Sequence, residues 1–415
     1  MRNSFFAAAA LLLPASAFAG GYIVPNTNPR DMGMADSAIA AQYNAAATVK
    51  NPAALAGQEG FDISVSGALI DLESTWNDSF GLSPKSHGTA GGLDSASLST
   101  RPAYPPTAFA SYGGKYNDIG YGVGVGLSIP GGGQVYWPGG WTGATQVTMV
   151  DRRIYGIYAM LAVQPIKQLK IGGGLVYYRG SEHLTQDVNF LGQVGGAELG
   201  TSGGAPSFDL STEITPVADL PLTIGIDYKH QAAINFSGFA HFDNVPAALR
   251  PSALDQPVNH ALTFPNQLNA GVAYRPIAPL LVSAGFTFER FVVYRQDAFV
   301  GTLGTSVIVP RDYHNGQTYR LGAEYTVLPA LKVRAGVLRD ISPTNTDRLN
   351  PSIPDANSTA VTVGATINLT PNLELSAAYF FDKEDTTTTT STDTFQGSYD
   401  THSNILSVGL AYRLK

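Results

Sequence analysis

Residues 319–338 read YRLGAEYTVLPALKVRAGVL, and this stretch decides the fold. Apolar side chains stand at every second position on both sides of a proline turn: Leu321, Ala323, Tyr325 and Val327 before it, and Leu331, Val333, Ala335 and Val337 after it. Successive side chains of a strand point to opposite faces, so each half predicts a strand with one apolar face and one polar or small face. The pattern recurs in 361–369, 373–381 and 406–414. It is typical of an all-β, closed antiparallel barrel in lipid.

The first nineteen residues have the build of a secretory signal peptide. Arg2 supplies the basic start, residues 5–13 are apolar, and Ala17-Phe18-Ala19 is a small-residue cleavage signal. A membrane anchor is the disfavoured alternative, because the apolar run is too short for about 30 Å of hydrocarbon and Pro14 interrupts it. We expect cleavage after Ala19.

Composition supports a membrane barrel and excludes several other classes. No later stretch offers about 20 uninterrupted apolar residues, so the mature chain can cross a bilayer only with strands. The chain is 44% hydrophobic, yet its mean hydropathy is only +0.01. Cysteine is absent, which excludes disulfides and thiolate metal sites, and the formal charge of −7 argues against a nucleic-acid partner. We expect no cofactor, no metal and no catalytic residues.

Extended along the chain, the same rule predicts about fourteen strands of the length of a tilted bilayer crossing. The predicted spans are 61–73, 104–113, 119–130, 151–163, 169–181, 206–216, 221–231, 263–275, 280–294, 316–327, 331–341, 359–370, 373–384 and 403–414. An even number of strands places both termini on one side.

The connections between these strands alternate in length. Seven are long: 74–103, 131–150, 182–205, 232–262, 295–315, 342–358 and 385–402; the short ones include 164–168, 217–220, 276–279, 328–330 and 371–372. Bacterial outer-membrane barrels keep short turns in the periplasm and long loops outside, so we expect both termini in the periplasm of a Gram-negative cell. A soluble β-sandwich also alternates, but the short and long rhythm and the signal peptide disfavour it.

A further segment, residues 20–60, precedes the first strand. It is rich in Ala, Asn and Pro, with a helix-prone part at 35–49. Because it precedes the first predicted strand of the barrel wall, we expect it to form a plug inside the barrel. The predicted organisation is a signal peptide (1–19), a plug or hatch (20–60) and the barrel (61–415).

Four motifs occur in order along the chain. They are Met32-Gly33-Met34-Ala35; Asn51-Pro52-Ala53; Phe264-Pro265 with Gly271-Val272-Ala273-Tyr274; and a stretch from Tyr319-Arg320-Leu321-Gly322 through Arg334-Ala335-Gly336, Ser342-Pro343 and Ile353-Pro354-Asp355-Ala356-Asn357 to Gly364. In these motifs the chain resembles the FadL/TodX family of outer-membrane channels for hydrophobic compounds, from about residue 20 to the C terminus.

The resemblance implies passive transport of long-chain fatty acids, with aromatic hydrocarbons as the alternative cargo. It also implies a fourteen-stranded barrel with a hatch and an exit through a lateral opening where a wall strand is kinked. We expect a monomer that contacts outer-membrane lipid, including lipopolysaccharide, and is inserted by the barrel assembly machinery. The chain departs from the pattern at its end, because barrels of this kind commonly finish on an aromatic residue and this one finishes on Lys415.

Two segments are candidates for gating. Asn51-Pro52-Ala53 is an ordinary firm turn from its residues, since Asn51 can bond its own backbone and Pro52 fixes φ; the resemblance makes it part of the hatch. In the third strand, inward glycines leave bare backbone toward the lumen: Gly120, Gly122, Gly124 and Gly126, with Tyr121, Val123, Val125, Leu127 and Ile129 facing outward. These glycines either mark the lateral opening or provide a flat surface on which the plug packs.

Inward cations are candidates for binding a carboxylate. The alternation places Lys229, Arg275, Arg320, Lys332, Arg334 and Arg413 in the lumen row. Arg334 lies opposite Glu324 in the hairpin, a pair that stabilises a sheet. Arg320 has no partner in the sequence pattern and is the better ligand candidate, although a lumen charge is more often solvated or paired.

Aromatic loop residues are candidates for capture of an oily ligand. Phe236, Phe239 and Phe242 lie in the long connection 232–262, where an exposed apolar cluster favours binding. Trp137 and Trp141 fit an interfacial aromatic girdle instead.

Two other functions share parts of this pattern. An outer-membrane lipid hydrolase is disfavoured because the seven histidines lie mostly in loops or at strand ends and no G-x-S-x-G or H-E-x-x-H motif accompanies them. A polar-solute porin has the same kind of barrel but leaves an aqueous channel, whereas a plug suits an oily cargo.

Overall fold

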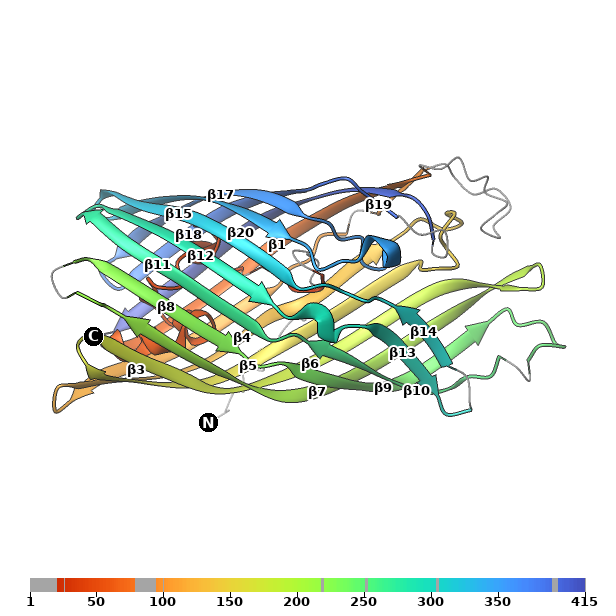
Figure 1. The fold of residues 1–415 in the computed structure, drawn as a ribbon, viewed down its shortest axis with the longest axis horizontal. Helices are drawn as coiled ribbons and strands as arrows, with labels where there is room; N and C mark the ends of the chain where they lie inside the picture. Colours follow the sequence, from red (N-terminus) through yellow and green to blue (C-terminus); the bar gives the residue numbers. More distant parts are fainter. Residues whose placement is uncertain are drawn as a thin grey trace, which may run out of the picture.

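The computed structural model describes residues 21–25, 27–78, 95–99, 101–217, 220–250, 253–303, 306–389 and 395–414. The predicted signal peptide lies outside these ranges. Within them, twenty antiparallel strands form one sheet (Figure 1). The strands are β1 (Gly60–Asn77), β2 (Ser95–Ser97), β3 (Pro106–Tyr116), β4 (Ile119–Tyr136), β5 (Met149–Ile166), β6 (Leu169–Phe190), β7 (Gln193–Ile214), β8 (Leu222–Lys229), β9 (Ala232–Asp243), β10 (Gln256–Phe264), β11 (Gln267–Ile277), β12 (Leu280–Glu289), β13 (Gln296–Gly301), β14 (Ser306–Pro310), β15 (Gly316–Leu328), β16 (Leu331–Ile341), β17 (Ser358–Thr370), β18 (Leu373–Glu384), β19 (Thr387–Thr388) and β20 (Ser398–Leu414).

The sheet closes on itself. β1 pairs with β3 on one side and with β20 on the other, where the register runs from Phe61 opposite Leu414 to Asn77 opposite Ser398. Four wall strands are interrupted by short irregular segments, so that each consists of two labelled strands. These pairs are β8 and β9, β10 and β11, β12 and β13, and β14 and β15. With each interrupted strand counted once and the short β2 and β19 set aside, the described wall is the predicted closed barrel of fourteen strands.

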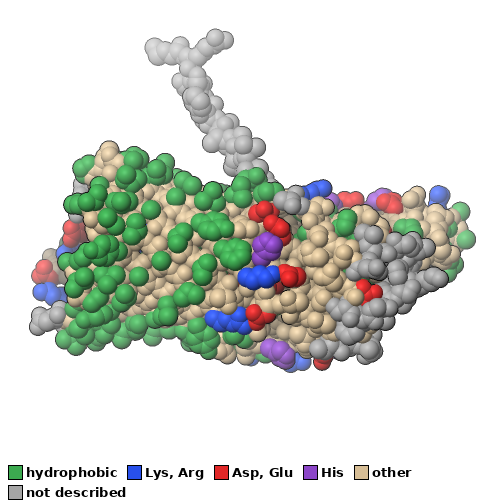
Figure 2. All heavy atoms as spheres, turned by 90° about the horizontal axis from the view of Figure 1, so that it is seen from above, with side chains coloured by type: hydrophobic (Ala, Val, Ile, Leu, Met, Phe, Trp, Pro, Cys, Tyr) green, Lys and Arg blue, Asp and Glu red, His purple; other side chains and the backbone are tan. Residues whose placement is uncertain are grey.

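The two faces of the wall follow the predicted alternation. Leu321 and Leu406 point outward and are 59% and 51% exposed, while inward Glu324 and Ser407 are buried. Apolar side chains cover the half of the barrel nearer the short turns (Figure 2). A belt of this kind is what the hydrocarbon of a bilayer requires. No helix in the described ranges is long and apolar enough to span a membrane.

Several predicted loops are largely strand, which corrects the sequence analysis. β6 and β7 run through 182–205 and leave a two-residue turn, in which Leu191 and Gly192 both have positive φ (56° and 102°), as a type I′ hairpin turn needs. β9 and β10 occupy most of 232–262, and β13 and β14 most of 295–315. These strand segments were missed because their outward residues are often Gly, Ser, Asn or charged, so no apolar alternation marks them.

Residues 21–25 and 27–59 lie inside the barrel, toward the end where the C terminus lies (Figure 1). They contain two one-turn helices, α1 (Pro29–Met32) and α2 (Ala47–Lys50), and the 3-10 helix η1 (Pro52–Gly57). Two further 3-10 turns, η3 (Phe291–Val293) and η4 (Thr346–Arg348), lie in the wall connections. The helix-prone segment 35–49 does not form one helix, because Ala35 and Asp36 adopt positive φ (51° and 61°) just after α1.

Candidate functional site

The plug packs directly on the inward glycines of β4. A Cβ atom added to Gly120, Gly122 or Gly124 would come closer than 3.0 Å to atoms of Ala56, Leu55 and Thr48, respectively, all of them in the plug. A Cβ on Gly126 would instead meet wall residue Phe109. The sequence left two interpretations of these glycines, a packing surface or a lateral opening. The contacts at Gly120, Gly122 and Gly124 are those of a packing surface. A lateral opening at these glycines remains a prediction.

Inward glycines in contact with the plug recur around the barrel, and the sequence analysis missed them. A Cβ on further inward glycines would also come within 3.0 Å of plug atoms: Gly113, Gly172, Gly225, Gly271, Gly322 and Gly336. They align across strands, because Gly225 lies opposite Gly271 and Gly322 opposite Gly336. An inward glycine at matching positions of successive predicted strands is the signal that would have revealed this ring.

Asn51-Pro52-Ala53 fixes the end of the plug to the wall. The amide Nδ2 of Asn51 donates to the Ile39 carbonyl (3.0 Å) and to the Thr212 carbonyl (3.4 Å), and the Ala53 N–H donates to Ser211 Oγ (2.8 Å). The expected bond from Asn51 to its own backbone is not made. The tripeptide therefore joins two parts of the plug to β7, which a local turn would not do.

The first described residues, 21–25, form a short segment that we call the latch. It lies against an irregularity in β4, where the register with β5 shifts between Ser128 and Gly131. Val24 N–H donates to the Pro130 carbonyl (3.1 Å) and Gly132 N–H donates to the Tyr22 carbonyl (2.9 Å). The latch thus pairs with backbone groups that the bulge frees.

The bulge also corrects one outward assignment. Ile129 was expected to face lipid, but it is only 5% exposed and packs with Val24, Met32 and Ala35 inside the barrel. A bulge changes the side-chain phase of a strand, and neither its position nor its presence follows from the alternation before it.

Tyr22 anchors the latch in an aromatic nest. Its ring is fully buried and meets Phe264, Phe291 and Tyr294 edge-on, with centroids 5.9, 5.3 and 5.3 Å away. Its hydroxyl donates to the Thr263 carbonyl. Burial raises the pKa of Tyr22 well above its usual value, so it remains a neutral donor.

Asp355 accepts a hydrogen bond from the first residue of the latch. Its Oδ2 accepts from Gly21 N–H (2.9 Å), Ser342 Oγ (2.5 Å) and Thr344 Oγ1 (2.9 Å). Burial raises the pKa of this carboxyl to about 7, and the charge of Asp340 adds to the effect. The Ile353-Pro354-Asp355-Ala356-Asn357 motif is therefore the partner of the latch.

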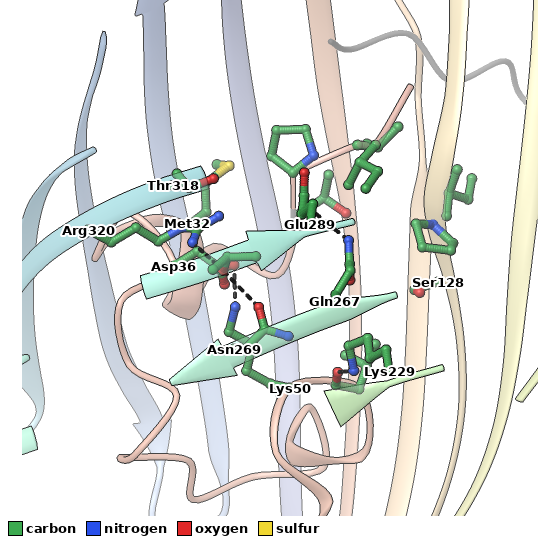
Figure 3. Close-up of a pocket in the computed structure, with 18 of the residues that line it drawn as sticks. Met32, Asp36, Lys50, Ser128, Lys229, Gln267, Asn269, Glu289, Thr318 and Arg320 are labelled. Carbon is green, nitrogen blue, oxygen red and sulfur yellow. Dashed lines mark hydrogen bonds and ion pairs between the residues drawn. The ribbon is translucent and has the colours of Figure 1, made fainter. Parts of the chain in front are cut away.

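An inner cavity of 140 Å³, lined in part by the latch, lies between the plug and the wall (Figure 3). Arg320 enters it from β15, as the alternation predicted, and its Nη1 donates to Thr287 Oγ1 (2.6 Å). Glu289 and Asp340 line the same cavity. Arg320 therefore stands among polar and acidic side chains, and carboxylate binding by Arg320 remains a prediction.

Arg334 holds a different position from Arg320. It is buried, with its Nε donating to Glu324 (2.8 Å) as the cross-strand pairing predicted, its Nη1 to Thr366 (2.6 Å) and its Nη2 to the plug residue Tyr43 (3.5 Å). It does not line the inner cavity. Its contacts are those of a structural tie between plug and wall, and ligand binding by Arg334 remains a prediction.

A larger outer cavity of 370 Å³ lies toward the long loops. Its apolar lining includes Val147, Leu199, Phe242, Val258, Phe299 and Val309. Two arginines also line it: Arg152, paired with Glu182, and Arg311, whose Nε donates to Asp297 (2.9 Å) and whose Nη2 donates to Ser352 (2.8 Å). Sequence reasoning missed both arginines. Arg152 lies near the start of the predicted strand 151–163 but was not among the inward cations singled out there, and Arg311 lies in the connection 295–315, whose course the alternation did not resolve.

The predicted aromatic residues are divided among several environments. Phe242 lines the outer cavity and Phe239 is 50% exposed on the outer face. Phe236 is 1% exposed and stacks on His260 with centroids 4.8 Å apart, so its assignment to an exposed cluster is wrong. Inward alternation continues through β9, which places Phe236 inside the barrel.

The assignment of Trp137 and Trp141 to a girdle is also wrong. They are 5% and 0% exposed and stack with centroids 4.3 Å apart. Trp76 and Phe395 complete the cluster at 5.8 and 5.6 Å from Trp141. These indoles form a small hydrophobic core among the long connections, and partners so distant in sequence gave no local signal.

Within the described part of the chain, no group of three or more His, Asp or Glu side chains is placed to hold a metal ion. The family model for outer membrane protein transport proteins (OMPP1/FadL/TodX) matches residues 10–414. The chain belongs to this family. Its members are outer-membrane transport channels for hydrophobic compounds, not enzymes.

Solved structures share the fold of this family member. A Pseudomonas aeruginosa FadL homologue superposes with a TM-score of 0.84 at 19% identity, over 95% of this chain and 100% of that one. The P. putida toluene transporter TodX gives 0.70 at 16% identity, over 95% and 98%. A 47 kDa outer membrane protein of Pasteurella multocida (strain Pm70) is 27% identical over 166 residues, which are 38% of this chain and 39% of that protein.

Proposed function

We propose that this FadL/TodX family member takes up long-chain fatty acids across the outer membrane by passive diffusion. The outer cavity carries the proposal. Its 370 Å³ falls within the roughly 300–1,000 Å³ of small-molecule sites, and its lining combines apolar side chains with polar ones that can orient a ligand. The guanidinium groups of Arg152 and Arg311 in this lining offer charge-assisted hydrogen bonds to a carboxylate.

The inner cavity represents the closed state of the same route. At 140 Å³ it is smaller than the usual range for a small-molecule site, and the latch forms part of its lining. Movement of the latch would enlarge it and free the bulge of β4, which is the proposed exit toward lipid. Arg320 is the proposed second carboxylate ligand. The short turns lie in the periplasm, together with both termini.

Uptake of aromatic hydrocarbons is the second candidate function. The observation that favours it is the nest around Tyr22, where Phe264, Phe291 and Tyr294 offer ring edges that a small aromatic ligand could occupy in place of Tyr22. A polar-solute porin is less compatible, because the plug is seated on glycines around the barrel.

Oleate binding to the purified chain separates these functions. Arg311→Gln should weaken oleate binding about tenfold or more, because a hydrogen bond to a charged group contributes about 1.5–3 kcal/mol. Methyl oleate, which lacks the charge, should bind both forms equally. Arg311 is a better position for this substitution than Arg152. After Arg311 is replaced, the carboxylate of Asp297 still accepts a hydrogen bond from the Tyr294 hydroxyl (2.7 Å). Arg320→Ala tests the inner site in the same assay.

The control variant is Arg179→Gln, an exposed arginine of β6 whose Nη2 donates to Ser202 (3.1 Å). It should bind oleate like the unmodified chain. Equal affinity of oleate for the Arg311→Gln and unmodified forms would remove the outer carboxylate site. Binding of toluene without oleate would favour the aromatic cargo, and a large steady conductance would favour a porin.

A further inference from the structure

A row of charged side chains marks the edge of the apolar belt on one face of the barrel. In Figure 2, basic, acidic and histidine side chains stand in a line where the green surface ends. Arg339 of β16 lies opposite Thr359 of β17, which lies opposite Lys383 of β18. The three residues thus form one cross-strand row, and His402 of β20 continues it opposite Lys383.

The next outward row toward the short turns is entirely apolar on these three strands. It consists of Val337, Val361 and Phe381, which lie opposite one another in the same order. Val337 is 41% and Val361 53% exposed. The change from hydrocarbon-facing to charged surface therefore takes place within two residues of each strand, which fixes the row at the border between acyl chains and headgroups.

The geometry of the row suits a phosphate group. Neighbouring strands are about 4.8 Å apart, so the backbones of Arg339 and Lys383 are separated by roughly 10 Å, with the Thr359 hydroxyl between them. Arg339 Nη1 already donates to Thr359 Oγ1 (2.9 Å). A phosphate above Thr359 is within reach of both long side chains and of the hydroxyl, and its oxygens accept all three kinds of donor.

Acidic partners do not cover the side from which a lipid would approach. Asp385 accepts from Arg339 Nη2 (2.5 Å) and Asp400 pairs with Lys383, but both acids stand on the long-loop side of the row. The side chains of Asp385 and Asp400 are 56% and 49% exposed, and ion pairs exposed to this extent contribute little to stability. Toward the belt, the next outward residues on the same strands as Arg339 and Lys383 are the apolar Val337 and Phe381.

The row has a limit at its β1 end. His402 Nε2 lies 3.6 Å from Glu73, and Asp71 lies opposite Asn404, so carboxylates enter the outward surface there. The cationic part is therefore confined to β16, β17 and β18. On the other side, Tyr319 of β15 lies opposite Arg339 and is 50% exposed, as an interfacial aromatic residue is.

We propose that Arg339, Thr359 and Lys383 bind a phosphate of the outer-leaflet glycolipid, lipopolysaccharide, whose acyl chains lie on Val337, Val361 and Phe381. This assignment rests on the proposed orientation, which places the row in the outer leaflet. It requires no movement of the plug and no cargo in either cavity. It gives this face of the barrel a fixed lipid neighbour.

The test is binding of lipid A to the purified full chain in detergent, with lipid A lacking its phosphates and phosphatidylglycerol as comparison ligands. The double variant Arg339→Gln/Lys383→Gln should lose about tenfold or more in affinity, because each basic residue near an anionic lipid surface contributes about 1 kcal/mol, or about fivefold. Thr359→Val, which removes only the hydroxyl, should lower affinity in the same direction. The dephosphorylated lipid should bind the unmodified chain no better than lipid A binds the double variant.

Lys115→Gln is the matched control. Lys115 is also exposed (61%) and paired with a carboxylate, Glu59 at 3.2 Å, but lies at the short-turn end. It should bind lipid A like the unmodified chain. Unchanged affinity of the double variant, or equal affinity for phosphatidylglycerol, would overturn the proposal. Oleate binding measured on the same samples shows separately whether the proposed cargo is correct, and the heat-dependent shift in electrophoretic mobility reports folding.

Discussion

Replacing the anchor of the latch should release it from the wall. Tyr22→Ala removes a fully buried ring and its three edge-on aromatic contacts. Truncation of a buried aromatic side chain costs about 3–5 kcal/mol, to which aromatic pairs contribute about 0.5–1.5 kcal/mol each. The lower figure applies because the hydrogen bonds of the latch to β4 remain. A loss of about 3 kcal/mol raises the population of the released latch by about 100-fold.

Hydrogen exchange at two amides reads this equilibrium directly. Val24 N–H and Gly132 N–H each donate across the boundary between latch and β4, so both become exchangeable only when the latch leaves. Tyr22→Ala should accelerate their exchange by about two orders of magnitude. Tyr22→Phe keeps the rings and loses the hydroxyl bond to Thr263, which contributes about 1 kcal/mol, so it should accelerate exchange only about fivefold.

The control is Tyr116→Ala, a change to a tyrosine that is 73% exposed at the end of β3, next to a short turn. Exchange at Val24 and Gly132 should then match the unmodified chain. If Tyr22→Ala leaves both amides as protected as before, the aromatic nest does not hold the latch. The closed state would then have to depend on other contacts, Asp355 among them.

Two other predictions concern the seat and the partner of the latch. Gly124→Val places a side chain against Thr48 and Leu55, and since overpacking costs about 1–3 kcal/mol, it should displace the plug and reduce oleate uptake while the barrel still assembles. Gly139→Val, at a site with open space, is its control, and normal uptake by the Gly124 variant would exclude a role for this face. Asp355 has a folded pKa of about 7 against an ordinary 3.8, so docking that buries it is most stable below about pH 4 and weakens as pH rises through about 7. Exchange at Val24, corrected for its intrinsic pH dependence, should therefore accelerate from about pH 6 to 8 in the unmodified chain but not in Asp355→Asn, and equal profiles would refute the linkage.

The alternation of side chains predicted the wall well wherever lipid lies on one side and the lumen on the other. The hairpin around Pro329 is an example, since Arg320 and Arg334 both face inward and Arg334 meets Glu324 as its register required. Beyond the apolar belt both faces of a strand meet water or polar residues, so the period-2 signal disappears. The outer parts of β6, β7, β9 and β10 were read as loops for that reason.

The candidate site was less accessible to sequence because it depends on contacts between distant segments. The bulge that buries Ile129 is stabilised by the latch, more than a hundred residues earlier in the chain. Asn51 has the side chain for a local turn, yet it bonds Ile39 and Thr212 instead. Arg311 reaches the outer cavity through a connection whose course no pattern fixed.

The unequal volumes of the two cavities have a kinetic consequence. A molecule that fills the 370 Å³ outer cavity does not fit in the 140 Å³ inner one while the latch is docked. On the proposed route, each passage would therefore wait for one excursion of the latch, and the frequency of that excursion would set a maximum rate. Under the proposed passive mechanism, uptake would saturate with concentration and show competition between cargoes, as a carrier does. An open pore would show a flux that keeps rising in proportion to concentration.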